Sequence, residues 1–127
     1  MEGQQFRATL NINTSVFVAI DADNAVSTAG AGALAIGIMH ESTWATPIPG
    51  SDPDVAVIAG QSKRVYQENE VCECRVGTGG LSAGDLVAPD AAGAGVVAIA
   101  TNPFSAICVQ GGAADERAKV VIAKGTA

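Results

Sequence analysis

Apolar and polar residues alternate one by one near the start of the chain, which is the pattern of a half-buried β-strand. The two faces of this segment carry, respectively, Phe6, Ala8, Leu10 and Ile12, and Arg7, Thr9, Asn11 and Asn13. The run ends at Asn13-Thr14, a polar pair that favours a turn. The alternation therefore predicts a first strand over residues 6–13.

Short apolar runs separated by Gly, Pro and Asx residues continue to the end of the chain. We predict further strands at residues 16–20, 35–38, 55–59, 63–66, 70–76, 86–88, 96–100, 106–109 and 117–122. The longest plausible helix, residues 113–118, is too short to be stable alone. Many short strands at close spacing predict an all-β fold with little helix, a compact β-barrel or sandwich of the β-clip or β-tulip kind.

Three stretches recur in the same order in the second half of the chain. Residues 17–22, 35–38 and 57–60 match residues 86–91, 106–109 and 121–125. We therefore predict duplicated β-units at about 16–60 and 70–125. They would form one β domain, residues 16–127, after an N-terminal strand or arm at residues 1–15. The first unit carries an insertion from Trp44 to Pro53 with three prolines, and repeats often accept insertions on their contact face.

Composition narrows the possible partners. The chain has 127 residues, 48% of them hydrophobic and 4% aromatic, enough for one compact domain with a core of small side chains. Its net charge is −6 with seven Lys and Arg, and no clustered basic face is visible, so we expect no nucleic acid as partner. No run approaches a membrane span, and no secretory signal is visible, so we expect no membrane association and synthesis in the cytosol.

Cys72 and Cys74 form the sharpest chemical motif. On a strand they point to the same face, so they could share a soft metal, but a zinc site would need further ligands from Cys108 and His40. The alternative is that Cys72, Cys74 and Val76 form the apolar face of a strand, and we favour it because free Cys is often buried. An odd number of cysteines without a signal peptide also argues against disulfides.

Other motifs fall short of an active site. His40–Thr43 lacks the elbow and partners of a catalytic triad. Gly77–Gly80 is not followed by the Lys and Ser/Thr of a phosphate loop. The acidic pairs within Asp21–Asp23 and Asp52–Asp54 could hold calcium, but neither continues into a binding loop, so we favour solvated turns. We therefore predict no catalytic, cofactor or metal residues, and a protein that is not an enzyme.

Two segments are candidates for binding a partner. Trp44, the only Trp, lies in the proline-rich loop, and aromatic residues in loops are enriched at binding hot spots. It could instead cap the core. The first strand could extend the sheet of a neighbour, although it could equally be an edge strand of its own domain. The predicted partner-binding residues are Phe6, Arg7, Leu10, Trp44, Pro47 and Ile48.

The second half also carries a string of motifs in a fixed order. The string includes the turn Ala83-Gly84-Asp85, the hairpin sequence of residues 90–98, the Ala-Ile strand at 106–109 and a closing Val-rich strand at 117–122. Over residues 70–123 it resembles the capsid cement (head decoration) proteins of tailed bacteriophages. The chain departs from that pattern at Cys108, where the family more often has Gly, and in its proline-rich insertion.

The resemblance implies a protein of the virion that binds the outer capsid surface and clamps neighbouring major capsid protein subunits. It would act without a cofactor, as a homotrimer first or a dimer second. Two other classes stay open at this point. One is a β-clip-type enzyme or ligand-binding domain, such as a nucleotide hydrolase, and the other is a tail-associated or receptor-binding β module.

Overall fold

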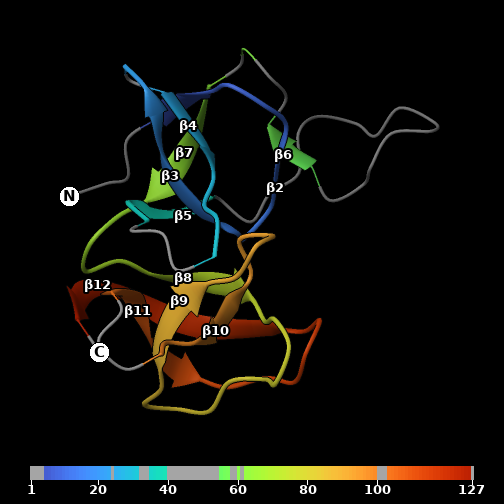
Figure 1. The fold of residues 1–127 in the computed structure, drawn as a ribbon, viewed down its shortest axis with the longest axis vertical. Helices are drawn as coiled ribbons and strands as arrows, with labels where there is room; N and C mark the ends of the chain where they lie inside the picture. The colour runs from blue at the N-terminus through green and yellow to red at the C-terminus, as the bar shows by residue number, and fades with distance from the viewer. Residues whose placement is uncertain are drawn as a thin grey trace.

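The computed structural model describes residues 5–23, 25–31, 35–39, 55–57, 60, 62–99 and 103–126, and these residues form strands, turns and loops without a helix. The all-β prediction is confirmed. Two lobes stack along the long axis of the molecule, as Figure 1 shows. We call residues 5–66 the N-lobe and residues 71–126 the C-lobe.

The N-lobe is a closed barrel of five strands in the order β1-β4-β3-β5-β7. The barrel strands are β1 (Gln5–Ala8), β3 (Phe17–Ala22), β4 (Ala25–Thr28), β5 (Gly37–Met39) and β7 (Ser62–Tyr66). A smaller sheet beside the barrel pairs β2 (Ile12–Asn13) with β6 (Val55–Val57). β1 pairs in parallel with β4 and antiparallel with β7, so it closes the barrel. Inside lie Ala8, Ile12, Val16, Val18, Val26, Met39, Val57 and Val65.

The C-lobe is a curled five-stranded sheet in the order β10-β9-β11-β12-β8. Its strands are β8 (Val71–Arg75), β9 (Leu86–Pro89), β10 (Gly95–Val97), β11 (Pro103–Gln110) and β12 (Arg117–Thr126). The two edges of this sheet meet at one parallel bridge between Val76 and Gly95. The C-lobe is therefore a barrel joined along one side by a single bridge.

The strand pairing of one lobe repeats in the other, pair by pair. In the first hairpin, Val18 pairs with Thr28 and Ile20 with Val26. Sixty-nine positions later (18 to 87, 28 to 97), Val87 pairs with Val97 and Pro89 with Gly95. The hairpin β9–β10 thus has the register of β3–β4, in agreement with the first of the three sequence matches.

The remaining contacts follow the same correspondence. Three pairs in the N-lobe have these counterparts in the C-lobe: Ala8–Val26 with Val76–Gly95, Ile38–Tyr66 with Ile107–Val121, and Arg7–Ser62 with Arg75–Arg117. Strands β1, β3, β4, β5 and β7 therefore correspond to β8, β9, β10, β11 and β12. The β1–β4 pairing in the N-lobe includes two residue pairs, whereas the C-lobe has one bridge at that place.

Two of the sequence matches differ from this correspondence. Pairing equates residues 37–39 with 106–108, which displaces the second match by two positions. The counterpart of β12 is β7, not the segment 57–60. Both displacements arise because small apolar residues recur at many positions of this chain, so the sequence alone leaves their alignment ambiguous.

The lobes share a core between them. Besides the N-lobe residues Phe17, Ala29, Ala35 and Ile38, the shared cluster contains Cys72, Cys74, Val76, Leu81, Val87, Ala106, Cys108, Ala118, Val120 and Ile122. The outer surface of the N-lobe barrel therefore packs against the interior of the C-lobe.

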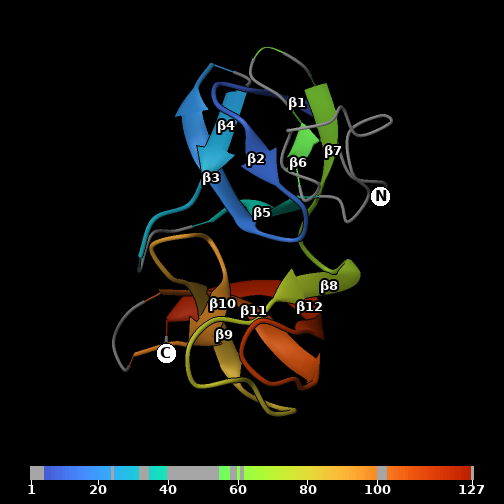
Figure 2. The ribbon, with the colours of Figure 1, turned by 90° about the vertical axis from the view of Figure 1, so that its right-hand side faces the viewer.

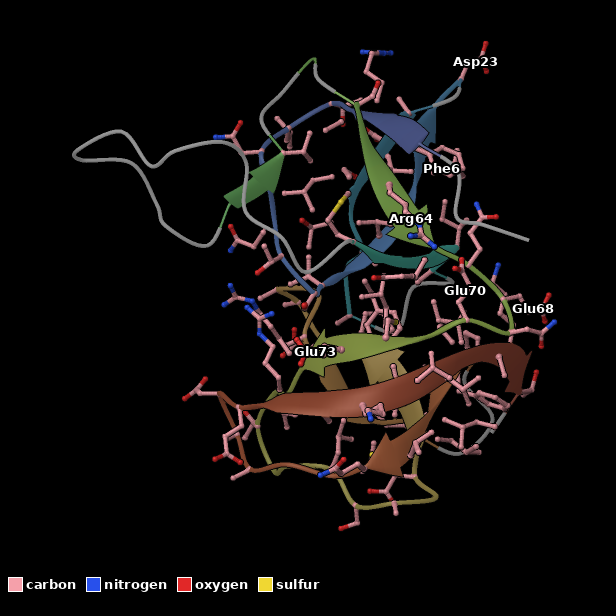
Figure 3. All side chains as sticks on the ribbon, turned by 180° about the vertical axis from the view of Figure 1, so that it is seen from behind. Phe6, Asp23, Arg64, Glu68, Glu70 and Glu73 are labelled. Carbon is pink, nitrogen blue, oxygen red and sulfur yellow. The ribbon has the colours of Figure 1, made fainter. Side chains whose placement is uncertain are left out.

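The linker between the lobes is held by one ion pair. Arg64, on β7, lies with a guanidinium nitrogen 2.9 Å from a carboxylate oxygen of Glu70, and its guanidinium stands 4.9 Å from the centre of the Tyr66 ring. The other Glu70 oxygen accepts the N–H of Gln67 at 2.9 Å. Figure 3 shows Arg64 and Glu70 side by side where β7 leads towards β8.

Three local expectations differ from the structure. Leu10, expected on the buried face of the first strand, is 66% exposed because β1 ends at Ala8 and the chain bends at residues 9–10. Strand β4, Ala25–Thr28, was not expected, since it has no clear alternation. The segment 113–118 is no helix: it makes a turn before β12 begins at Arg117.

Candidate functional site

Two arginines of the C-lobe form hydrogen bonds to the Thr14–Ser15 turn of the N-lobe. The backbone N–H of Arg75 donates to the carbonyl of Ser15 at 2.9 Å, and its Nε donates to the carbonyl of Thr14 at 2.9 Å. Arg117, opposite Arg75 on β12, donates to the hydroxyl of Ser15 at 2.8 Å and to that of Thr14 at 2.9 Å. Both hydroxyl residues are buried, so these bonds satisfy groups that have lost contact with water.

A second backbone contact fixes the lobes from the other side of the turn. The N–H of Phe17 donates to the carbonyl of Gly93 at 2.8 Å. A Cβ at Gly93 would come within 2.6 Å of the Thr28 methyl carbon and 3.1 Å of the Val16 Cβ. Glycine is therefore required here for close approach. The two views in Figures 1 and 2 show the loop between β9 and β10 reaching up against the N-lobe.

A hollow of about 300 Å³ lies at this junction. Its lining is polar on several sides and consists of Asn13, Val16, Arg75, Val76, Gly77, Thr78, Asp90, Ala92, Ala94 and Asp115. One carboxylate oxygen of Asp90 already accepts the N–H groups of Ala92 and Ala94, at 2.8 and 3.0 Å. That carboxylate shapes the loop, and the described lining residues include no His, Cys or Lys.

The three cysteines are core residues. All three are buried within the shared core, and none forms a disulfide bond. Burial raises the pKa of Cys74 to about 12, and burial followed by the nearby charge of Asp85 raises the pKa of Cys108. A thiol with a raised pKa stays protonated at neutral pH and is a poor ligand and nucleophile.

In the segments that the structure describes, no three His, Cys, Asp or Glu side chains gather closely enough to hold a metal ion. Within those same residues, no helix has the length and apolar character needed to cross a membrane.

The structure places three of the six predicted partner-binding residues. Phe6 is partly buried against the N-lobe core, Arg7 is exposed, and Leu10 is exposed. They lie on or just after β1, which is paired on both sides and so is not an edge strand available for sheet extension. Trp44, Pro47 and Ile48, together with His40–Thr43 and Asp52–Asp54, lie outside the described residues.

Sequence reasoning missed the junction. Thr14 and Ser15 looked like an ordinary turn, and Arg117 looked like one more charged residue on an alternating strand. The pairing of Arg75 with Arg117 on neighbouring strands depends on the β8–β12 register, and the sequence does not fix that register. A hint was available in Thr14 and Ser15 themselves, since hydroxyls beside a buried Val-Phe run need partners.

Comparison with known proteins identifies the fold as one found in a bacteriophage. No protein-family model and no curated protein matches the sequence. Among solved structures, the chain is similar to the head fiber gp8.5 N base in bacteriophage phi29, with a TM-score of 0.68 and 15% sequence identity. The match covers 95% of this chain and 92% of that one, so the two share their fold over nearly the whole length.

Proposed function

We propose that the chain is a capsid cement protein, which binds the outer surface of an assembled phage head and stabilises contacts between major capsid protein subunits. One observation carries the proposal: nearly the whole chain has the fold of the base of a phage head fiber. The resemblance of residues 70–123 to tailed-phage cement proteins supports the same role independently.

The proposed mechanism needs binding energy but no chemistry. A protein that binds the assembled lattice and not its separated subunits shifts the equilibrium towards the lattice. Because the lattice repeats its sites, modest contacts suffice, especially if the cement protein is a homo-oligomer and binds several sites at once. We propose a homotrimer at local threefold positions first, and a dimer at twofold positions second.

The contact residues belong to the proposal. Arg7 and Leu10 are exposed and Phe6 partly so, next to the barrel end that carries Asp21 and Asp23. We propose that these side chains, with those of the Trp44 to Pro53 insertion, meet the capsid. Figure 3 shows Phe6 and Asp23 at the end of the molecule away from the C-lobe.

The test uses phage heads purified without this protein. We expect the added protein to cosediment with expanded heads and to raise their resistance to heat and low salt. Leu10→Asp should weaken cosedimentation at least tenfold, whereas Ile99→Asp, at a similarly exposed residue (72% against 66%), should bind as the unmodified chain does. Heads that neither bind the protein nor gain resistance from it would refute the proposal.

The absence of enzyme activity is tested separately. We expect nucleotides and divalent metal ions to leave the melting temperature of the purified protein unchanged. A saturable rise with either ligand would instead support an enzyme or ligand-binding domain on this architecture.

A further inference from the structure

Within this chain the C-lobe packs on the N-lobe, and the repeated strand pairing gives that contact surface a counterpart in the C-lobe. We call the N-lobe surface that packs on the C-lobe the covered face; it contains Thr14, Ser15, Phe17, Thr28 and Ile38. The strand correspondence gives it a counterpart on the C-lobe, which we call the matching face. The matching face contains Ala83, Gly84, Leu86, Val97 and Ile107.

The turns of the two faces are equivalent in their hydrogen bonds as well as their position. The N–H of Ser15 donates to the carbonyl of Met39 at 3.2 Å, and the N–H of Gly84 donates to the carbonyl of Cys108 at 2.8 Å. Met39 and Cys108 are themselves counterparts, on β5 and β11. The matching face therefore presents a turn built as the covered one is.

The two faces differ in burial. Ser15, Phe17 and Ile38 have no exposed surface, because the C-lobe lies over them. On the matching face, the turn at 83–84 is exposed, Val97 is 52% exposed, and Leu86 and Ile107 are partly exposed. The C-lobe thus keeps an apolar version of a surface that is covered in the N-lobe.

One of the two arginines that bind the covered turn has an arginine counterpart in the N-lobe, whereas Arg117 corresponds to Ser62. Arg75, which holds the turn of the N-lobe, corresponds to Arg7 on β1. Arg7 is exposed. On the matching face the turn is followed by Asp85, whose carboxylate accepts the N–H of Ser82 at 2.8 Å, so a negative charge stands where an arginine would arrive.

Strand β1, which carries Arg7, and the matching turn lie at opposite ends of the molecule. Figure 2 shows β1 and β4 in the part of the N-lobe away from the C-lobe, and the yellow loop that leads into β9 at the bottom of the C-lobe. A surface and its complement at opposite ends cannot meet within one chain. They can meet between two copies.

We propose that a second copy of this chain binds head to tail. Arg7 of one copy forms hydrogen bonds to the 83–84 turn of the next copy. The end of the first copy's N-lobe barrel that carries Phe6 covers Leu86, Val97 and Ile107 of that next copy. The contact is heterologous, so it generates a ring if the rotation closes and a filament if it does not. Because the N-lobe barrel is already closed and filled, the second copy packs on the surface and does not insert into a core. The inference rests on the internal repeat and not on the capsid role. A copy that meets the capsid through Phe6 and Arg7 cannot bind a second copy through those residues, but its matching face stays available to the next copy.

The test uses the purified full-length protein without phage heads. By light scattering after gel filtration at about 100 µM protein, we expect the unmodified chain to be larger than a monomer. Arg7→Glu removes one side of the contact and Val97→Asp removes the other, so each variant alone should be a monomer. Mixed in equal amounts, they keep one intact contact and should give a 1:1 dimer that grows no further.

Matched substitutions control for charge and exposure. Lys124→Glu reverses an exposed positive charge on β12. Val71→Asp changes a valine that is 54% exposed, against 52% for Val97, on the strand at the other end of the sheet order. Both should assemble as the unmodified chain does, and circular dichroism should show that all four variants are folded. A monomeric unmodified chain, or mixed variants that fail to pair, would overturn the proposal.

Discussion

Ser15 and Gly84 occupy the same place in the two halves of the chain, and both adopt a left-handed backbone, with φ of 59° and 92°. Only one of them is glycine. Ser15 bears the unfavourable conformation at the position where its hydroxyl accepts a hydrogen bond from Arg117. Gly84 has no side chain that could form such a hydrogen bond, and a side chain at its positive φ would lower stability through backbone strain.

This comparison predicts the effect of a methyl group at Gly84. A Cβ there would meet no atom within 4 Å, so Gly84→Ala should lose about 1 kcal/mol of unfolding free energy from its positive φ alone. Gly30→Ala is the matched control, because that position is also open but lies outside the positive-φ region. Urea denaturation of the two variants should show the loss only at Gly84; equal stabilities would contradict the backbone explanation.

Arg117 should matter for stability through its two hydroxyl partners. Arg117→Ala leaves the buried hydroxyls of Thr14 and Ser15 with fewer partners, and we expect a loss of about 1–2 kcal/mol in thermal or urea unfolding. Arg117→Lys should restore less than half of it, because an ammonium cannot match the planar guanidinium fork. Lys119→Ala, an exposed cation two residues along β12, should change stability by less than about 0.5 kcal/mol.

The equivalent isoleucines Ile38 and Ile107 should differ sharply when truncated. Ile38 is fully buried between the lobes, so Ile38→Ala should cost about 2–5 kcal/mol. Ile107 lies partly exposed on the matching face, so Ile107→Ala should cost less than about 1.5 kcal/mol at a protein concentration that keeps the chain monomeric. Equal losses would mean that the shared core does not distinguish the two lobes.

Alkaline pH should weaken the protein through Cys74. Burial raises the pKa of its thiol from 9.0 to about 12. Below pH 9 the thiol is protonated in both states and its contribution to stability is complete. Between pH 9 and 12 the unfolded thiol ionises first, so stability falls by about 1.4 kcal/mol per pH unit. Cys74→Ala lacks this term, so its deficit relative to the unmodified chain, measured by urea unfolding under reducing conditions, should shrink by about 2 kcal/mol from pH 9 to 10.5. A constant deficit would contradict the assignment.

The sequence was informative where a residue type has one common structural use. Gly77–Gly80 and Ala83–Asp85 form turns as predicted, and alternation placed Cys72 and Cys74 in the core. It failed where structure depends on distant partners. Nothing in Ala25–Thr28 indicates that the strand pairs in parallel with β1, and nothing near Arg117 indicates a turn 102 residues earlier in the chain.

Leu10 illustrates the same limit at one residue. Its alternation with Ala8 and Ile12 favours the interior, but alternation holds only while the strand is straight. A bend at residues 9–10, where the side chain of Thr9 donates to Asp21 at 2.6 Å, turns Leu10 outward. Alternation therefore places a side chain only as far as its strand runs straight, as it does along β12.

The single bridge between Val76 and Gly95 gives the two halves unequal independence. The first half closes around its own interior. Phe17 and Ile38 of the first half complete the interior of the second half, so without them that interior would be exposed to solvent. The fold thus combines one lobe with a closed interior and one lobe whose interior is completed by the other, so removal of the first half would expose the core of the second.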